Sequence, residues 1–251
     1  MKKSLLLFLF LCSAGAAVAQ TDSTEVRRYN FLKVNLSSVV FNNYSFQYER
    51  VLSKRWSVAL GYRFMPSSNI PFKSNVDSFV DETDDATQFL IDNAKISNTA
   101  ITPEVRLYLG KGYGRGFYLA PYYRYSKFKA ETVKVEYTDE NGDDQVVTMG
   151  GDITGNSFGL MLGAQWTIGS HFVIDWWIIG GHIGSGSGKI EGTTSQLLDP
   201  AEQAQVRDVI EEFDLPFIDE EVEVTPNGAS VKMDGGWGGI RAFGLSVGYR
   251  F

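Results

Sequence analysis

The chain has 251 residues with 30 acidic and 23 basic side chains, which gives a formal charge of −7 at neutral pH. This acidic balance argues against a nucleic acid as partner, because phosphate binding relies on an excess of Lys and Arg. Cys12 is the only cysteine, which excludes an internal disulfide and a zinc site built on several thiolates. Metal-ligand spacings, phosphate-binding loops and nucleophile motifs are also missing from the sequence, so we expect no cofactor.

The first 19 residues predict a cleaved export signal. Two lysines precede an apolar core, and small residues lead up to a cleavage site after Ala19. A lipoprotein signal at Cys12 is the alternative, although the bulky Leu11 stands where a small residue is usual. Residues 20–30 are then expected to form a short periplasmic segment. Beyond them no run approaches the roughly 20 apolar residues of a membrane helix, so a membrane crossing would need strands.

Eight segments alternate apolar and polar residues with a period of two, the pattern of strands that have lipid on one face. The final segment shows it most clearly, because Phe243, Leu245, Val247, Tyr249 and Phe251 alternate with small or charged residues. Each segment is near the length that a tilted membrane strand needs. The predicted strands are 31–41, 44–52, 55–65, 99–109, 116–128, 154–168, 171–182 and 240–251.

The connections between these strands alternate between short and long. The short turns are 53–54, 110–115 and 169–170, and the long connections are about 66–98, 129–153 and 183–239. Outer-membrane barrels have this asymmetry, with short periplasmic turns and long extracellular loops, whereas a soluble β-sandwich gives no reason for it. We therefore predict an all-β fold, an eight-stranded antiparallel transmembrane β-barrel over residues 31–251.

Acidic residues gather in the three long connections. These hold 25 of the 30 acidic residues but 7 of the 23 basic ones. The extracellular surface is therefore predicted to be strongly acidic. Runs such as 81–85 and 219–221 could bind divalent cations that bridge to lipopolysaccharide phosphates. They lack the spacing of a dedicated calcium loop, so we expect such binding to be weak and diffuse.

Two stretches carry a family resemblance. One comprises Lys33-Val34-Asn35-Leu36, Tyr44-Ser45-Phe46-Gln47-Tyr48-Glu49-Arg50 and Arg55-Trp56-Ser57-Val58-Ala59-Leu60-Gly61, and the other comprises Ile101-Thr102-Pro103-Glu104-Val105-Arg106 and Tyr118-Leu119-Ala120-Pro121-Tyr122-Tyr123-Arg124-Tyr125. They resemble the small, uncharacterised outer-membrane barrel proteins of Bacteroidota, with an architecture similar to the eight-stranded OmpA and OmpX class. The resemblance implies a barrel in the outer membrane of a Gram-negative bacterium, in contact with membrane lipid and lipopolysaccharide. It implies no chemistry.

Charged residues fall on the inward-facing positions of the predicted strands. Lipid disfavours such charges, and the interior of an eight-stranded barrel is wide enough only for side chains to fill it. We therefore predict an ionic cluster that plugs the lumen, in which five cations face three anions. The alternative is a narrow anion channel past the same residues. The predicted members are Lys33, Glu49, Arg63, Glu104, Arg106, Arg124, Asp175 and Arg250.

Pro103 and Pro121 interrupt two neighbouring predicted strands, because proline cannot donate a ladder hydrogen bond. If these strands pair across their turn, both prolines lie in the same seam between the two strands. The prolines could mark a β-bulge or unpaired positions, or the weakened seam could be a lateral gate through which a lipid tail enters. Such a seam resembles that of the outer-membrane palmitoyltransferase. His182, near the outer rim, would be the catalytic base, but Ser185 lies three residues on and so on the opposite strand face. A lipid-modifying enzyme is therefore the catalytic alternative.

The long connections are predicted to contain structure of their own. Asn141-Gly142 is a strong hairpin signal, so the strands on either side should project beyond the membrane. A helix is expected to start at Asp199, and a shorter one over 84–93. The longer helix has an apolar face formed by Val206, Val209, Ile210 and Phe213. This face could cap the barrel mouth or dock an extracellular or neighbouring membrane protein.

The function that these features favour is structural rather than catalytic. The predicted protein is a monomeric outer-membrane barrel whose lumen is plugged by the ionic cluster. Its acidic loops are predicted to serve a structural or surface-interaction role. The lipid-modifying enzyme and the narrow anion channel stay open as alternatives.

Overall fold

The computed structural model describes residues 28–40, 42–69, 94–194, 196–212 and 218–251. The predicted signal peptide at 1–19, most of the predicted segment at 20–30 and the predicted helix at 84–93 lie outside these residues. Phe213 lies outside them as well. Within the described residues, no helix has the length and apolar character needed to cross a membrane.

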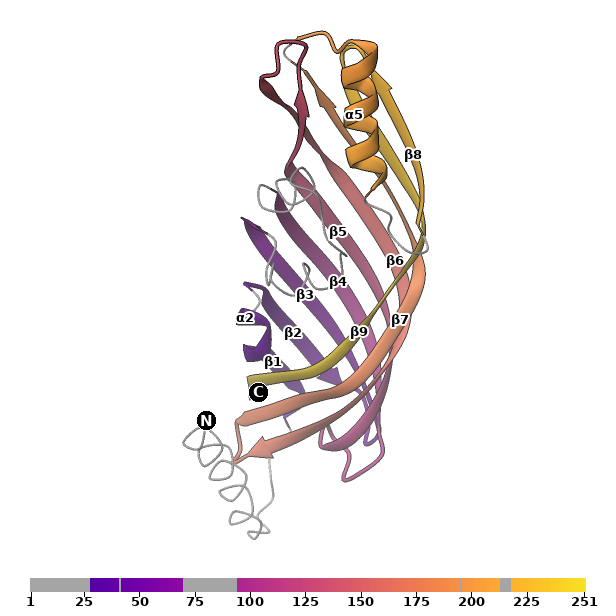
Figure 1. The fold of residues 1–251 in the computed structure, drawn as a ribbon. Coiled ribbons are helices and arrows are strands. Elements are labelled where there is room, and N and C mark those ends of the chain that lie inside the picture. The colour runs from indigo at the N-terminus through magenta and orange to yellow at the C-terminus, as the bar shows by residue number, and fades with distance from the viewer. Residues whose placement is uncertain (1–27, 41, 70–93, 195, 213–217) are drawn as a thin grey trace, which may run out of the picture.

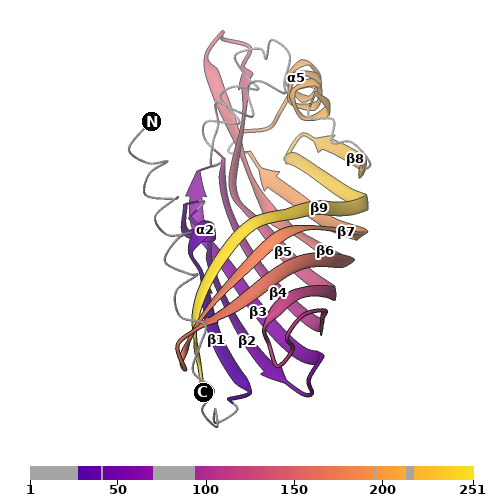
Figure 2. The same ribbon diagram turned by 90° about the horizontal axis from the view of Figure 1, so that it is seen from below.

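Eight strands form a closed antiparallel ring, which confirms the predicted fold (Figure 1, Figure 2). The described strands are β1 (Asn30–Asn35), β2 (Tyr44–Val51), β3 (Trp56–Asn69), β4 (Lys95–Tyr108), β5 (Gly116–Thr138), β6 (Asp144–Ile168), β7 (Phe172–Thr193), β8 (Ile218–Thr225) and β9 (Gly228–Arg250). Sequential pairing runs from β1 to β7, β9 pairs with β7, and β1 closes the ring against β9 with Val34 opposite Val247. The strand outside the ring is β8, which pairs with the first part of β9.

The barrel has two unlike ends. At the turn end, the chain reverses tightly at 52–55, 109–115 and 169–171, and β1 begins and β9 ends there. At the loop end, β5, β6, β7 and β9 continue well beyond β1, β2 and β3 (Figure 1). The long strands therefore form a curved sheet that rises from one side of the ring.

The strand extensions fold with β8 and helix α5 (Pro200–Glu211) into a subdomain with its own core. We call this subdomain the crown and define it as residues 131–151, 188–194, 196–212 and 218–235. The predicted hairpin lies at its tip, where Thr138 pairs with Asp144 across the turn. In Figure 1, α5 lies against this sheet. The buried core consists of Val135, Tyr137, Val147, Met149, Leu198, Val206, Val209, Ile210, Val224, Ala229, Val231 and Met233.

Helix α5 turns its apolar face toward the crown sheet. Val206, Val209 and Ile210 are all buried in the crown core, which corrects the expectation that these three residues face a partner. A short helix is stable only where its apolar stripe is buried, and the strand extensions provide that surface. The start of the helix is fixed by Asp199, which forms a reciprocal capping box with Glu202.

Several strands extend beyond the predicted segments, and two departures change how the fold is understood. The first predicted strand, 31–41, ends at Asn35, whose side chain caps the helical turn α2 (Leu36–Val39). The predicted loop at 183–239 is largely strand, since β7 extends to Thr193 and β9 begins at Gly228. Glycine and serine alternate over 184–188, and glycine fills four of the five positions over 235–239. With so few apolar side chains, the period of two is weak in these two stretches.

Candidate functional site in the charged lumen

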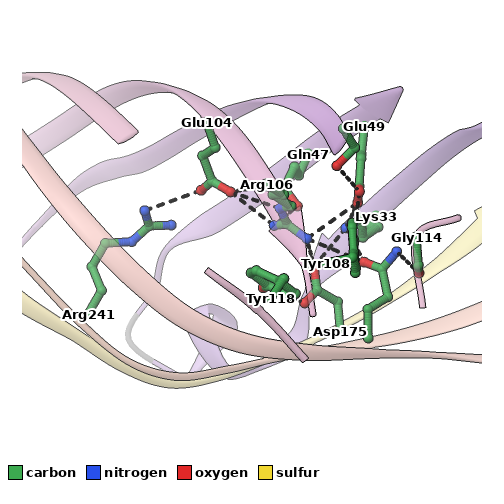
Figure 3. Close-up of polar contacts among 12 residues, drawn as sticks. Lys33, Gln47, Glu49, Glu104, Arg106, Tyr108, Gly114, Tyr118, Asp175 and Arg241 are labelled. Carbon is green, nitrogen blue, oxygen red and sulfur yellow. Dashed lines mark hydrogen bonds and ion pairs between the residues drawn. The ribbon is translucent and has the colours of Figure 1, made fainter. Parts of the chain in front are cut away.

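Charged side chains from four strands meet inside the ring (Figure 3). We call them the lumen cluster: Lys33 on β1, Glu49 on β2, Glu104 and Arg106 on β4, and Asp175 on β7. Alternation along each strand turns these residues away from the outer surface. All five are at most 3% exposed, so the cluster is a dry ionic core.

Arg106 is the centre of the lumen cluster. Its Nη1 lies 2.7 Å from Oδ2 of Asp175, and its Nη2 lies 3.0 Å from Oε2 of Glu104. The same Nη2 donates to Oε1 of Gln47 at 2.8 Å. The guanidinium also stacks over the Tyr118 ring, 4.3 Å from its centroid. One side chain thus ties β4 to three other strands of the ring, β2, β5 and β7.

Lys33 uses all three of its ammonium protons in the same network. Its Nζ lies 2.6 Å from Oε2 of Glu49, 2.7 Å from Oδ2 of Asp175 and 2.6 Å from Oε1 of Gln165. An ammonium group has three donors and no acceptor. No donor of Lys33 is therefore left for water.

Hydroxyl groups satisfy the remaining oxygens of two carboxylates. Oε1 of Glu49 accepts from Tyr108 at 2.7 Å and from Ser57 at 2.6 Å. Oδ1 of Asp175 accepts from Tyr118 at 2.7 Å. Breaking a buried ion pair is costly because it leaves a charge without compensation. The complete pairing of these groups explains how such a core can be stable.

Arg241 on β9 is a sixth member that the sequence prediction missed. Its Nη1 lies 3.3 Å from Oε1 of Glu104. Its guanidinium also stacks on the Tyr122 and Trp177 rings, 4.7 and 4.4 Å from their centroids. With Arg241 included, the lumen cluster holds three cations and three carboxylates. The charges of the lumen cluster then balance.

The inward position of Arg241 follows from an irregularity shared by β7 and β9. Phe243 has a left-handed backbone with φ 54°, and the β6–β7 register shifts by one residue between Leu162 and Gly163. Beyond this point Ile240 is 81% exposed and Arg241 faces inward, the reverse of strict alternation. A bulge exchanges the faces of the residues after it. Nothing in the hydropathy pattern marks its position.

The other three predicted members lie apart from the lumen cluster, which corrects the prediction of a single eight-residue group. Arg63 on β3 and Arg124 on β5 lie closer to the loop end. Arg63 donates from Nη2 to Oδ1 of Asn98 at 2.6 Å. Arg250 lies at the turn end, where its Nε donates to the Arg28 carbonyl at 2.9 Å. The lumen charges therefore form three groups along the barrel.

Pro103 and Pro121 lie in the seam between β4 and β5, as the sequence suggests. The register is the same on both sides of the prolines, with Glu104 opposite Tyr122 between them. The one register shift given for this seam lies at Lys95, near the loop end. The prolines thus occupy unpaired positions in an unbroken register, and the alternative of a β-bulge at them is wrong.

His182 on β7 lies beside Tyr122, with its Nδ1 3.2 Å from the phenol oxygen. Among the described residues, Tyr122 is the hydrogen-bond partner of the His182 imidazole, and no carboxylate contacts the ring to orient it. Ser185 is exposed. In the same part of the chain, no group of three or more His, Cys, Asp or Glu side chains could hold a metal ion. A triad and a metal centre therefore have no geometric support in these residues.

The family model that matches this chain is described as a protein of unknown function (DUF3575), and the match covers residues 5–203. The chain belongs to this family. No curated protein matches it. Two solved structures are similar to it. One is a major outer membrane protein from Thermus thermophilus, 13% identical with a TM-score of 0.38, over 89% of this chain and 98% of that chain. The other is Acinetobacter baumannii CarO, 15% identical with a TM-score of 0.32, over 86% of this chain and 100% of that chain.

The residues matched by the DUF3575 family model include only part of the candidate site. Lys33, Glu49, Glu104, Arg106 and Asp175 lie within the matched residues, whereas Arg241 lies beyond them. The strand β9 that closes the ring is also outside the match. In this DUF3575 protein, the balancing cation of the lumen cluster therefore comes from the part of the chain that the family model leaves uncovered.

Proposed function

We propose that this DUF3575 protein is an integral barrel of the outer membrane of a Gram-negative bacterium, closed by its lumen cluster and holding the crown at the cell surface. The observation that carries the proposal is the complete burial and pairing of the lumen cluster. Ions and water need space beside the lining side chains, and none of the five residues is more than 3% exposed. The proposed role is therefore structural or interactive rather than conductive.

The outer face of the ring supports a membrane location. Large apolar side chains are exposed around the ring, and soluble proteins rarely show contiguous apolar patches of that extent. Aromatic residues gather toward the turn end, as in the interfacial girdles of membrane barrels. Exposed aliphatic residues include Leu32, Val34, Val58, Leu60, Ile101, Val105, Leu160, Ile179, Leu245 and Val247. Exposed aromatic residues toward the turn end include Tyr48, Trp56, Trp166, Phe172 and Tyr249.

The two ends of the barrel support one orientation. Outer-membrane barrels place short turns in the periplasm and long connections outside. The turn end would then face the periplasm, and the crown would face the medium beside lipopolysaccharide. Its surface carries carboxylates such as Asp143, Asp219 and Glu223, which would interact with cations or basic partner surfaces rather than nucleic acid.

Conductance measurements test the closed lumen. We expect the purified protein, reconstituted into planar bilayers, to give no steady single-channel current under conditions in which a general porin conducts. The control is heat-modifiable mobility on the same sample, which shows that the inserted protein is folded. Reproducible currents from folded wild-type protein would contradict the plug and favour the anion-channel alternative.

Crosslinking on intact cells tests the interactive role of the crown. Leu197 is 74% exposed in the crown, so a photoreactive residue there should capture a neighbouring membrane or extracellular protein. The same group at Lys111, in a tight turn at the opposite end, should not give these adducts. Identical adducts from the two positions would argue against the crown as the interaction element.

We propose no catalytic role for His182. Its hydrogen bond to Tyr122, with no described carboxylate as partner, supports a packing role. In the proposed scaffold the seam at Pro103 and Pro121 admits no lipid, so replacing both prolines with valine should change stability only. Loss of a lipid modification in reconstituted membranes on His182→Ala, with the barrel still folded, would favour the enzyme instead.

A further inference from the structure

Three arginines line the lumen on the loop-end side of the lumen cluster. Arg63 lies four residues beyond Ala59 on β3, and Arg124 lies two residues beyond Tyr122 on β5, both toward the loop end. The guanidinium of Arg241 approaches from β9 and stacks on Tyr122. We call Arg63, Arg124 and Arg241 the arginine basin. The three guanidinium groups repel one another, and their positive charges disfavour a charged imidazole at His182.

Among the residues that the structure describes, the arginine basin lacks the anions that buried cations require. Arg124 is only 6% exposed, and its side chain forms no hydrogen bond or ion pair with any described residue. The Nε of Arg63 is buried without a hydrogen-bond partner. Glu104 is the carboxylate that attracts Arg124 electrostatically. Both oxygens of Glu104 are already in contact with other arginines, because one lies beside Arg241 and the other beside Arg106. A buried charge without a partner is strongly unfavourable.

The charge count gives the size of the deficit. The lumen cluster and the arginine basin together contain five cations and three carboxylates among the described residues. The two uncompensated charges fall on Arg63 and Arg124, because Lys33, Arg106 and Arg241 are paired. One doubly charged anion between these two guanidinium groups would restore neutrality.

We propose that the arginine basin binds a doubly charged tetrahedral oxyanion of the phosphoryl class. A guanidinium presents a planar fork of donors that matches two oxygens of a phosphoryl group. Two such forks on different strands, at Arg63 and Arg124, suit a tetrahedral anion better than a planar carboxylate. The free Nε of Arg63 supplies a further donor.

The surroundings make the arginine basin an end point for an entering anion rather than part of a path. Arg63, His182 and Arg241 are partly exposed, so solvent reaches the basin. The other five residues of the lumen cluster, on the turn-end side of the basin, are buried, so an anion that enters from the loop end stops there. This inference goes beyond the proposed scaffold role, because it gives the closed barrel a ligand.

Thermal unfolding in detergent tests the proposal. Wild-type protein is titrated with inorganic phosphate, and a parallel titration with chloride at the same ionic strength serves as the comparison. A separate titration uses micelles containing phosphatidic acid. The test variant is Arg124→Gln, and the control is Lys129→Gln, an exposed position on the same strand. A second variant, Arg63→Gln, serves if the first does not fold, as judged by heat-modifiable mobility.

We expect phosphate to raise the unfolding midpoint of wild type and Lys129→Gln by several degrees, in a saturable manner. Arg124→Gln should lose this response and should be at least as stable as wild type without phosphate, because a repulsive charge has gone. A response only to phosphatidic acid would support the same site with a lipid headgroup as its source. Equal shifts with chloride, an unchanged response in both arginine variants, or no response in wild type to either source would overturn the proposal.

Discussion

The guanidinium of Arg241 on β9 contacts the carboxylate of Glu104 on β4, with Nη1 of the arginine 3.3 Å from Oε1 of the glutamate. Glu104 contacts Arg106 through its other oxygen at 3.0 Å. It therefore joins the balanced lumen cluster on one side to the cation-rich arginine basin on the other. Few single substitutions in the lumen should disturb as many charges.

Replacing Glu104 with alanine tests this central position. We expect a loss of about 3–5 kcal/mol in the free energy of unfolding, because buried arginines lose a charged partner. The measurement is chemical or thermal unfolding in detergent, followed by heat-modifiable mobility. Asp143→Ala, at an exposed hairpin tip, is the control and should change stability very little. Equal, negligible losses in the two variants would mean that the lumen is wet.

The crown core should be separable from the barrel in stability. Ile210 is buried between α5 and the crown sheet, so Ile210→Ala should destabilise the crown by about 2–5 kcal/mol through lost burial and a cavity. Leu197→Ala, at a position that is 74% exposed, is the matched control. Limited proteolysis should cut the crown of the first variant faster while the barrel keeps its folded mobility. Similar cleavage rates in the two variants would argue against a packed crown core.

The cap of α5 should make the crown sensitive to acid. The pKa of the Asp199 carboxyl is lowered, because the backbone N–H of Glu202 donates to it. Its stabilising contribution is therefore complete above the unfolded-state pKa and is lost as the pH falls through the lower folded-state pKa. Hydrogen exchange, corrected for intrinsic rates, should show α5 amides losing protection over this range. Asp199→Asn keeps an acceptor but removes the charge, so its protection should vary less with pH; an unchanged profile would contradict the mechanism.

The orientation of the barrel can be read by labelling. Asp143→Cys lies at the tip of the crown hairpin, and Lys111→Cys lies in a tight turn at the other end. An impermeant thiol reagent on intact cells should label the first and not the second. After lysis both should react, which controls for burial. Labelling of Lys111→Cys alone on intact cells would invert the proposed topology.

Strict alternation predicted the ring and most of its inward charges, because lipid-facing and lumen-facing side chains differ so sharply in polarity. Phe243, Leu245, Val247 and Tyr249 on β9 are all exposed, as is Phe251 directly after it, as the sequence predicts. The same rule failed for Arg241, since a local bulge is a backbone property that side-chain polarity does not record. It also missed the extensions of β7 and β9 over 184–188 and 235–239, where glycine leaves almost no hydropathy contrast.

The first helical turn was missed for a different reason. Leu36 continues the apolar alternation of β1, so periodicity favoured a longer strand. Asn35 ends that strand by accepting a hydrogen bond from the Ser38 N–H, and an asparagine followed by serines was the available signal. The grouping of the lumen charges could not be predicted from the sequence. Alternation along a strand shows which face a residue lies on, but it does not show the position of that residue along the barrel axis relative to residues on other strands.

The closing seam of the ring determines how the protein can be assembled. β1 pairs with β9 only over Phe31–Asn35, and the Asn30 N–H donates to the carbonyl of Phe251 at 3.0 Å. Contacts between residues so distant in the chain form late, because the intervening loop must lose its entropy first. The sheet therefore stays open, with two bare edges, until β9 is in place. A variant truncated before Ser246 would not form a smaller barrel; it would remain an unclosed sheet prone to pair with its neighbours.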